Sequence, residues 1–73
     1  MAFTRTELAK YDGKNGNPAY VAYQGRVWDV SKVFVDGEHN GCFAGLDLTD
    51  RLETYHEAAI LENGVIVGGI SDE

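Results

Sequence analysis

The two histidines of the chain, His39 and His56, lie in one short segment that also holds its only cysteine, Cys42. Imidazole nitrogens bind metals and exchange protons near neutral pH, and thiolates are also metal ligands. Isolated histidines in a short chain are also often surface groups, or structural groups held by hydrogen bonds. The segment is therefore a candidate metal or cofactor site, with two unrelated structural histidines as the alternative.

The residues around the histidines favour a hydrophobic cofactor over a hydrated ion. Small residues such as Gly41 and Ala44 let the backbone approach a flat ring closely. Haem is a ring of this kind, and protein histidines hold its iron as axial ligands. The candidate apolar walls are Val30, Phe34, Leu48, Leu52 and Ile60. Because the chain has no Cys-x-x-Cys-His motif, a bound haem would be non-covalent, of the b type.

A zinc site is a further alternative, formed by His39, Cys42 and His56 with a carboxylate. It lacks the closely paired cysteines or histidines of strong zinc motifs. Cys42 is equally explained as a small buried apolar residue, and its being alone excludes a disulfide within the chain. The sequence has no nucleophile motif, no recognisable carboxylate pair and no phosphate-binding loop, so we expect no enzyme activity.

Length and charge set further bounds. A chain of 73 residues predicts a single domain, 1–73, whose core is small enough to benefit from a bound cofactor. The net charge of −6 argues against nucleic acid as a partner, because nucleic acid binding requires clustered basic residues. Residues 36–57 contain six acidic side chains and a single basic one, Arg51. This acidic segment favours a basic protein partner, with a solvated surface as the plainer explanation.

No apolar run is long enough to span a membrane, and residues 1–20 contain no apolar core of a signal peptide. We therefore expect a cytoplasmic protein without a membrane span.

The first half of the chain predicts a helix followed by a hairpin. Thr4 and Glu7 have the spacing of a capping box, which favours a helix over residues 5–10. Residues 19–23 and 26–30 are rich in β-branched and aromatic side chains and flank a two-residue loop, which predicts a β-hairpin. Trp28 and Val30 would share one face of it, with Val27 and Asp29 on the other.

The second half predicts helical turns followed by a strand. Ser31 is expected to cap a helical turn over residues 31–34. Residues 39–64 predict two helices or helical turns, the second capped by Thr49, with Leu48, Leu52, Tyr55 and Ala59 at helical spacing. Residues 65–70 predict a short buried strand, and residues 71–73 a frayed tail. The fold class is therefore α+β.

Three stretches resemble a known family: "YDG" at residues 11–13, "AYVAYQGRVWDVS" at 19–31 and "AGLDLT" at 44–49. Together they resemble the small prokaryotic branch of the cytochrome b5-like haem/steroid-binding family, with similarity over about residues 3–67. The resemblance implies a cytochrome b5-like fold, in which a small mixed sheet and short helices form a haem crevice.

The resemblance also implies the ligands. The histidine of a His-x-Gly stretch is one axial ligand in this family, which corresponds to His39 with Gly41. The histidine after the Asp-Leu-Thr helix is the second, which corresponds to His56. The cytochromes b5 proper have His-Pro-Gly-Gly and a longer spacing, whereas this spacing is similar to that of the prokaryotic branch. Membrane-associated progesterone-receptor relatives use a tyrosine ligand instead, and Tyr55 keeps that alternative open.

Ligation by two histidines leaves no iron position open for oxygen or peroxide. The resemblance therefore implies one-electron transfer with a redox partner that has a basic docking face. The alternative is a module that binds haem, a steroid or another apolar ligand without transferring electrons.

Overall fold

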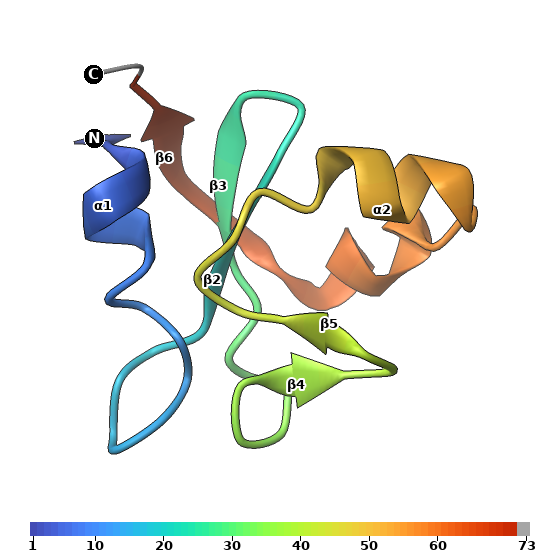
Figure 1. The fold of residues 1–73 in the computed structure, drawn as a ribbon, viewed down its shortest axis with the longest axis horizontal. Coiled ribbons are helices and arrows are strands. Elements are labelled where there is room, and N and C mark those ends of the chain that lie inside the picture. Colours follow the sequence, from blue (N-terminus) through green and yellow to red (C-terminus); the bar gives the residue numbers. More distant parts are fainter. Residues whose placement is uncertain (72–73) are drawn as a thin grey trace.

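The computed structural model describes residues 1–71, which form a mixed sheet, a small second hairpin and three short helices (Figure 1). The α+β class predicted from the sequence is confirmed. The elements in chain order are β1 (Ala2–Phe3), α1 (Arg5–Leu8), β2 (Tyr20–Tyr23), β3 (Arg26–Asp29), β4 (Glu38–His39), β5 (Cys42–Phe43), α2 (Thr49–Thr54), the 3-10 helix η1 (Ala58–Asn63) and β6 (Val65–Ile70).

The main sheet has the strand order β1-β6-β3-β2, with β1 parallel to β6 and the other neighbours antiparallel. The last strand therefore lies beside the first, and Ser71 N–H donates to the Phe3 carbonyl at 2.7 Å. Ser71 is thus hydrogen-bonded rather than frayed, and residues 72–73 of the predicted tail lie outside the described residues.

The prediction that β6 is buried is wrong for its first two residues. Val65 and Ile66 are 64% and 47% exposed, because neither hydrophobic cluster extends over them. Val67 and Ile70 are partly buried and pack against the smaller cluster, beside Phe3. The strand is therefore central in the sheet but covered only towards its end.

The sheet separates two hydrophobic clusters. The smaller consists of Phe3, Leu8, Ala22 and Val27, on the side of α1. The larger gathers the side chains beneath α2, η1 and the β4–β5 hairpin, which lie together away from α1 (Figure 1). Val27 belongs to the first cluster, whereas Val30 and the partly buried Trp28 belong to the second. The predicted division of the β3 side chains between two faces is therefore confirmed for these residues.

Helix α1 has the predicted capping box. Thr4 Oγ1 accepts from Glu7 N–H at 3.1 Å, and Glu7 Oε1 accepts from Thr4 N–H at 2.9 Å. The helix ends at Leu8 rather than at Lys10, because the backbone N–H groups of Lys10 and Tyr11 donate to carbonyls three residues back instead of four.

The β2–β3 hairpin is confirmed, and Gln24 and Gly25 take the positive φ values, 49° and 81°, that its two-residue turn needs. The prediction that Ser31 caps a helical turn is wrong. Its hydroxyl accepts from Ala19 N–H at 2.9 Å and donates to Asp29 Oδ1 at 2.6 Å. Ser31 therefore ties the two ends of the hairpin together. The predicted helical turn itself forms, because Phe34 N–H donates to the Val30 carbonyl at 2.9 Å.

Residues 45–49 run along the free edge of β2 and cover it. Ala22 N–H donates to the Leu46 carbonyl at 3.0 Å, and Leu48 N–H donates to the Ala22 carbonyl at 2.8 Å. Gln24 N–H donates to Thr49 Oγ1 at 2.9 Å. These bonds use backbone groups that an edge strand otherwise exposes, and they fix where α2 begins.

The prediction that Thr49 caps α2 is wrong, because Thr49 is the first residue of the helix. Asp47 supplies the acceptor instead: its Oδ1 accepts from Thr49 N–H at 3.0 Å and from Thr49 Oγ1 at 2.7 Å. Its Oδ2 pairs with Arg5 Nη1 at 3.2 Å. Partial burial opposes ionisation of Asp47, but the bonds from Thr49 and Arg5 outweigh it and lower the pKa of Asp47 below its ordinary value of 3.8.

The segment 39–64 contains the two predicted helical elements, α2 and η1, but it begins with an unpredicted hairpin, β4–β5. The helical periodicity holds for the buried Leu48 and Leu52 and fails at Tyr55, which is 63% exposed. The pattern fails there because α2 ends at Thr54, so later residues follow a different path.

Replacement of Asp47 by alanine is expected to lower the free energy of unfolding by about 1 kcal/mol at pH 7, as for loss of a helix cap. Because the folded-state pKa is lowered, this stabilisation is present above pH 3.8 and is lost as the pH falls below it. Urea unfolding at pH 7 and pH 3 measures both. Asp50→Ala is the control, since that neighbouring carboxylate accepts no hydrogen bond within residues 1–71. An equal loss at both pH values would contradict the assignment.

Candidate functional site

His39 is placed by the β4–β5 hairpin. Asn40 and Gly41 form its turn, with the positive φ values of 49° and 82° that a two-residue hairpin turn needs. His39 is paired directly with Cys42, and cross-strand partners share a face, so the imidazole lies on the side of the buried Cys42. The ring is half-buried and stacks on Phe34, with 5.8 Å between ring centroids.

His56 is placed by the end of α2. The Glu57 N–H donates to the Leu52 carbonyl at 2.8 Å, and the His56 N–H donates to the Glu53 carbonyl at 3.4 Å. This pair of bonds defines a Schellman motif, in which the residue after the C-cap is left-handed and is usually glycine. His56 occupies that position with a φ of 54°. A residue with a Cβ is less stable there than glycine, and the imidazole is exposed.

Both imidazoles keep their ring nitrogens free of protein partners. Within residues 1–71, neither side chain forms a hydrogen bond or an ion pair. The described part of the chain also holds no group of three His, Cys, Asp or Glu side chains that could bind a metal ion. A zinc site built on His39, Cys42 and His56 therefore has no geometric support.

The predicted apolar walls come together in the larger cluster. Its buried members include Val30, Phe34, Ala44, Leu48 and Leu52, and Ile60 packs against them from η1. Val30 and Leu52 have no exposed surface, and Phe34, Ala44 and Leu48 have almost none. Cys42 is buried in the same cluster, as predicted for a small apolar residue.

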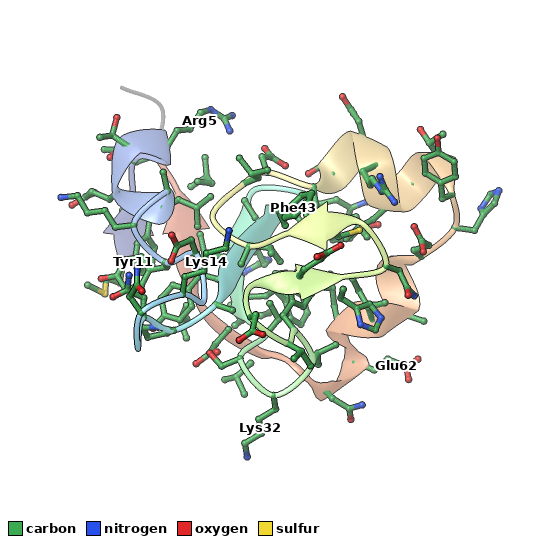
Figure 2. All side chains as sticks on the ribbon, turned by 60° about the horizontal axis from the view of Figure 1, so that its bottom comes forward. Arg5, Tyr11, Lys14, Lys32, Phe43 and Glu62 are labelled. Carbon is green, nitrogen blue, oxygen red and sulfur yellow. The ribbon has the colours of Figure 1, made fainter. Side chains whose placement is uncertain are left out.

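A separate pocket, lined by Asp29, Ser31, Lys32, Asn63 and Val65, contains none of the predicted site residues. Lys32 projects outward there (Figure 2), and the pocket lies beside the exposed start of β6.

None of the helices in residues 1–71 has the length and apolar character needed to cross a membrane.

Sequence reasoning missed Arg51, on α2. Its Nη2 donates to the Asn40 carbonyl at 3.0 Å, and its guanidinium lies 5.1 Å from the centroid of the Tyr55 ring. Its Nε lies 3.9 Å from Glu57 Oε1. The one signal in the sequence was that Arg51 is the only basic residue within the acidic segment 36–57.

Residues 4–71 match the model of the cytochrome b5-like haem/steroid-binding domain family. Two solved structures are similar over nearly their whole length. A cytochrome b5 domain protein from Hadesarchaea is 43% identical, with a TM-score of 0.86 over 97% of this chain and 99% of the other. One from Methanococcoides burtonii is 41% identical, with a TM-score of 0.86 over 97% of both chains. A comparison with curated protein sequences gave no significant match.

His56→Gly is expected to raise the free energy of unfolding of the ligand-free protein by about 0.5 kcal/mol, since glycine relieves the left-handed strain but loses more chain entropy. His56→Ala is the matched control, because it removes the imidazole but keeps the Cβ. Urea unfolding of both variants beside the wild type measures the difference. A loss of stability in both would show that the imidazole makes stabilising contacts, contrary to its lack of partners within residues 1–71.

Proposed function

This chain belongs to the cytochrome b5-like haem/steroid-binding family, and we propose that it binds haem b non-covalently through His39 and His56 and carries single electrons. The observation that supports this most directly is the placement of the two imidazoles. Each lies at a tight reversal of the chain, beside Asn40-Gly41 or after α2, and neither imidazole forms a hydrogen bond or ion pair within residues 1–71. A histidine at a glycine-favoured position stabilises the fold less than glycine, which points to a role in binding.

The residues present suit this cofactor. Two imidazole nitrogens would be the protein ligands of the haem iron, and the partly buried Ile60, packed against the cluster that holds Phe34 and Leu48, would supply apolar contact to the ring. The bound haem supplies a ferric/ferrous couple. His39, stacked on Phe34 and held by β4, would supply one ligand nitrogen. His56 presents the other from a defined helix end, and together they would exclude exogenous ligands.

The acidic segment would guide a basic redox partner. Asp36, Glu38, Asp50 and Glu53 are exposed and lie on the elements that hold the two histidines or directly beside them. Charges of one sign around a redox centre raise the encounter rate with an oppositely charged partner, more so at low salt. We therefore propose a partner with a basic docking face and a weak, rapid association.

The second candidate is a binding module for haem, a steroid or another apolar ligand, without electron transfer. Tyr55 favours it, because its ring is 63% exposed next to His56 and is chemically able to bind haem iron. A tyrosine ligand would leave the opposite iron position open.

Titration of the ligand-free protein with hemin is expected to saturate at a single equivalent and to give a low-spin spectrum. His39→Ala and His56→Ala are each expected to weaken binding by about a hundredfold or more, while Tyr55→Phe leaves it unchanged. Carbon monoxide is expected not to bind the reduced protein.

The variants separate the two candidates. Loss of the spectrum in Tyr55→Phe, or rapid binding of carbon monoxide, would support the module with an open position. Hemin binding in both histidine variants that equals that of the wild type would exclude ligation by histidine.

Oxidation of the reduced holoprotein by a cationic cobalt or ruthenium complex is expected to slow several-fold as salt shortens the screening length from about 30 Å to about 8 Å. An anionic oxidant is expected to speed up. Stopped-flow absorbance measures both rates. The double change Glu38→Gln and Asp50→Asn should weaken the salt effect more than Glu62→Gln, whose side chain projects from η1 (Figure 2). Equal effects of the two changes would contradict a docking role for the acidic segment.

A further inference from the structure

Arg51 contacts both of the segments that hold the histidines. Its Nη2 donates to the carbonyl of Asn40, the residue after His39, at 3.0 Å. Its guanidinium stacks on Tyr55, the residue before His56, and its Nε faces Glu57, the residue after His56. One side chain therefore reaches a neighbour of one histidine and both neighbours of the other.

The turn at Asn40-Gly41 is shaped to accept this side chain. A Cβ added at Gly41 would lie 3.3 Å from Arg51 Nη2, closer than side chains usually approach. The bond goes to a backbone carbonyl, so it fixes the path of the turn itself. A charged donor makes such a bond stronger than a neutral one does.

The other side of the guanidinium is less completely bonded. Arg51 Nε is buried and has no hydrogen-bond partner within residues 1–71, while Glu57 Oε1 lies 3.9 Å away. Electrostatic attraction to Glu57 and stacking on Tyr55 hold the guanidinium in place, while its Nε–H group forms no hydrogen bond within residues 1–71.

We propose that Arg51 is a positioning residue that couples the turn after His39 to the segment around His56 and so sets how the two imidazoles lie relative to each other. This inference rests on the proposed function, in which both imidazoles bind one haem. Within residues 1–71, Arg51 contacts Asn40, Tyr55 and Glu57 but neither imidazole. A planar fork that bonds and stacks at the same time is specific to arginine, so lysine cannot fully replace it.

The test has two parts. In the ligand-free protein, Arg51→Ala is expected to speed amide exchange about tenfold in residues 39–43 and in residues 55–58 together, while the β2–β3 hairpin is unchanged. In the hemin-loaded protein, transfer of hemin to excess apomyoglobin is expected to be about tenfold faster, with the electron paramagnetic resonance lines of the low-spin iron broadened.

Arg26→Ala is the matched control, because it removes the same charge from an exposed position on β3. Arg51→Lys keeps the charge and the stem, so it guards against loss of folding, and we expect a smaller increase in both segments. Faster exchange in only one segment, or none in either variant, would overturn the coupling. If the wild type failed to bind hemin, the proposed function would fail, but the exchange of the ligand-free protein would still decide the role of Arg51.

Discussion

The pairing of residues 45–49 with the edge of β2 is the constraint on which the site depends. The Tyr20 and Ala22 carbonyls accept from Gly45 N–H and Leu48 N–H, and Ala22 N–H donates to Leu46. This segment lies between the two histidines in the sequence. The sheet fixes the path of this segment. The β4–β5 hairpin that precedes it and helix α2 that follows it therefore lie on the same side of the sheet, away from α1 (Figure 1).

Each histidine is then placed by a local rule of backbone geometry. The reversal at Asn40-Gly41 uses residues that tolerate positive φ, so it costs little. The reversal after α2 uses His56 instead of glycine and is less stable for it. The larger cluster lies beneath both reversals, and Arg51 links the two reversals through its contacts with Asn40 and Tyr55. The two ends of the site thus differ, since one is a strand packed on Phe34 and the other an exposed helix end.

Much of this fold could be predicted from short-range signals. The capping box at Thr4 and the hairpin around Gln24-Gly25 both depend on residues close in sequence. The errors occur where distant partners decide. The Ser31 hydroxyl accepts from Ala19 N–H across the hairpin instead of capping a turn, and the Thr49 hydroxyl accepts from the distant Gln24 N–H instead of capping α2.

The candidate site divides in the same way. The apolar residues could be assigned from their spacing, because burial follows periodicity within α2 until the helix ends at Thr54. The exposure of Tyr55 and the reach of Arg51 to Asn40 could not, since both depend on how a helix end meets a hairpin. The nearly full-length similarity to cytochrome b5 domain proteins establishes the family. The proposal that His39 and His56 are the ligands rests on where these two residues lie in the fold.

Electron paramagnetic resonance of the ferric, hemin-loaded wild type at low temperature tests the central claim most directly, because the signal reports the axial ligands of the iron. Ligation by His39 and His56 predicts a low-spin signal of the bis-imidazole type from all of the bound iron. A predominant high-spin signal would contradict it and would leave an open or tyrosine-bound iron as the description of this site.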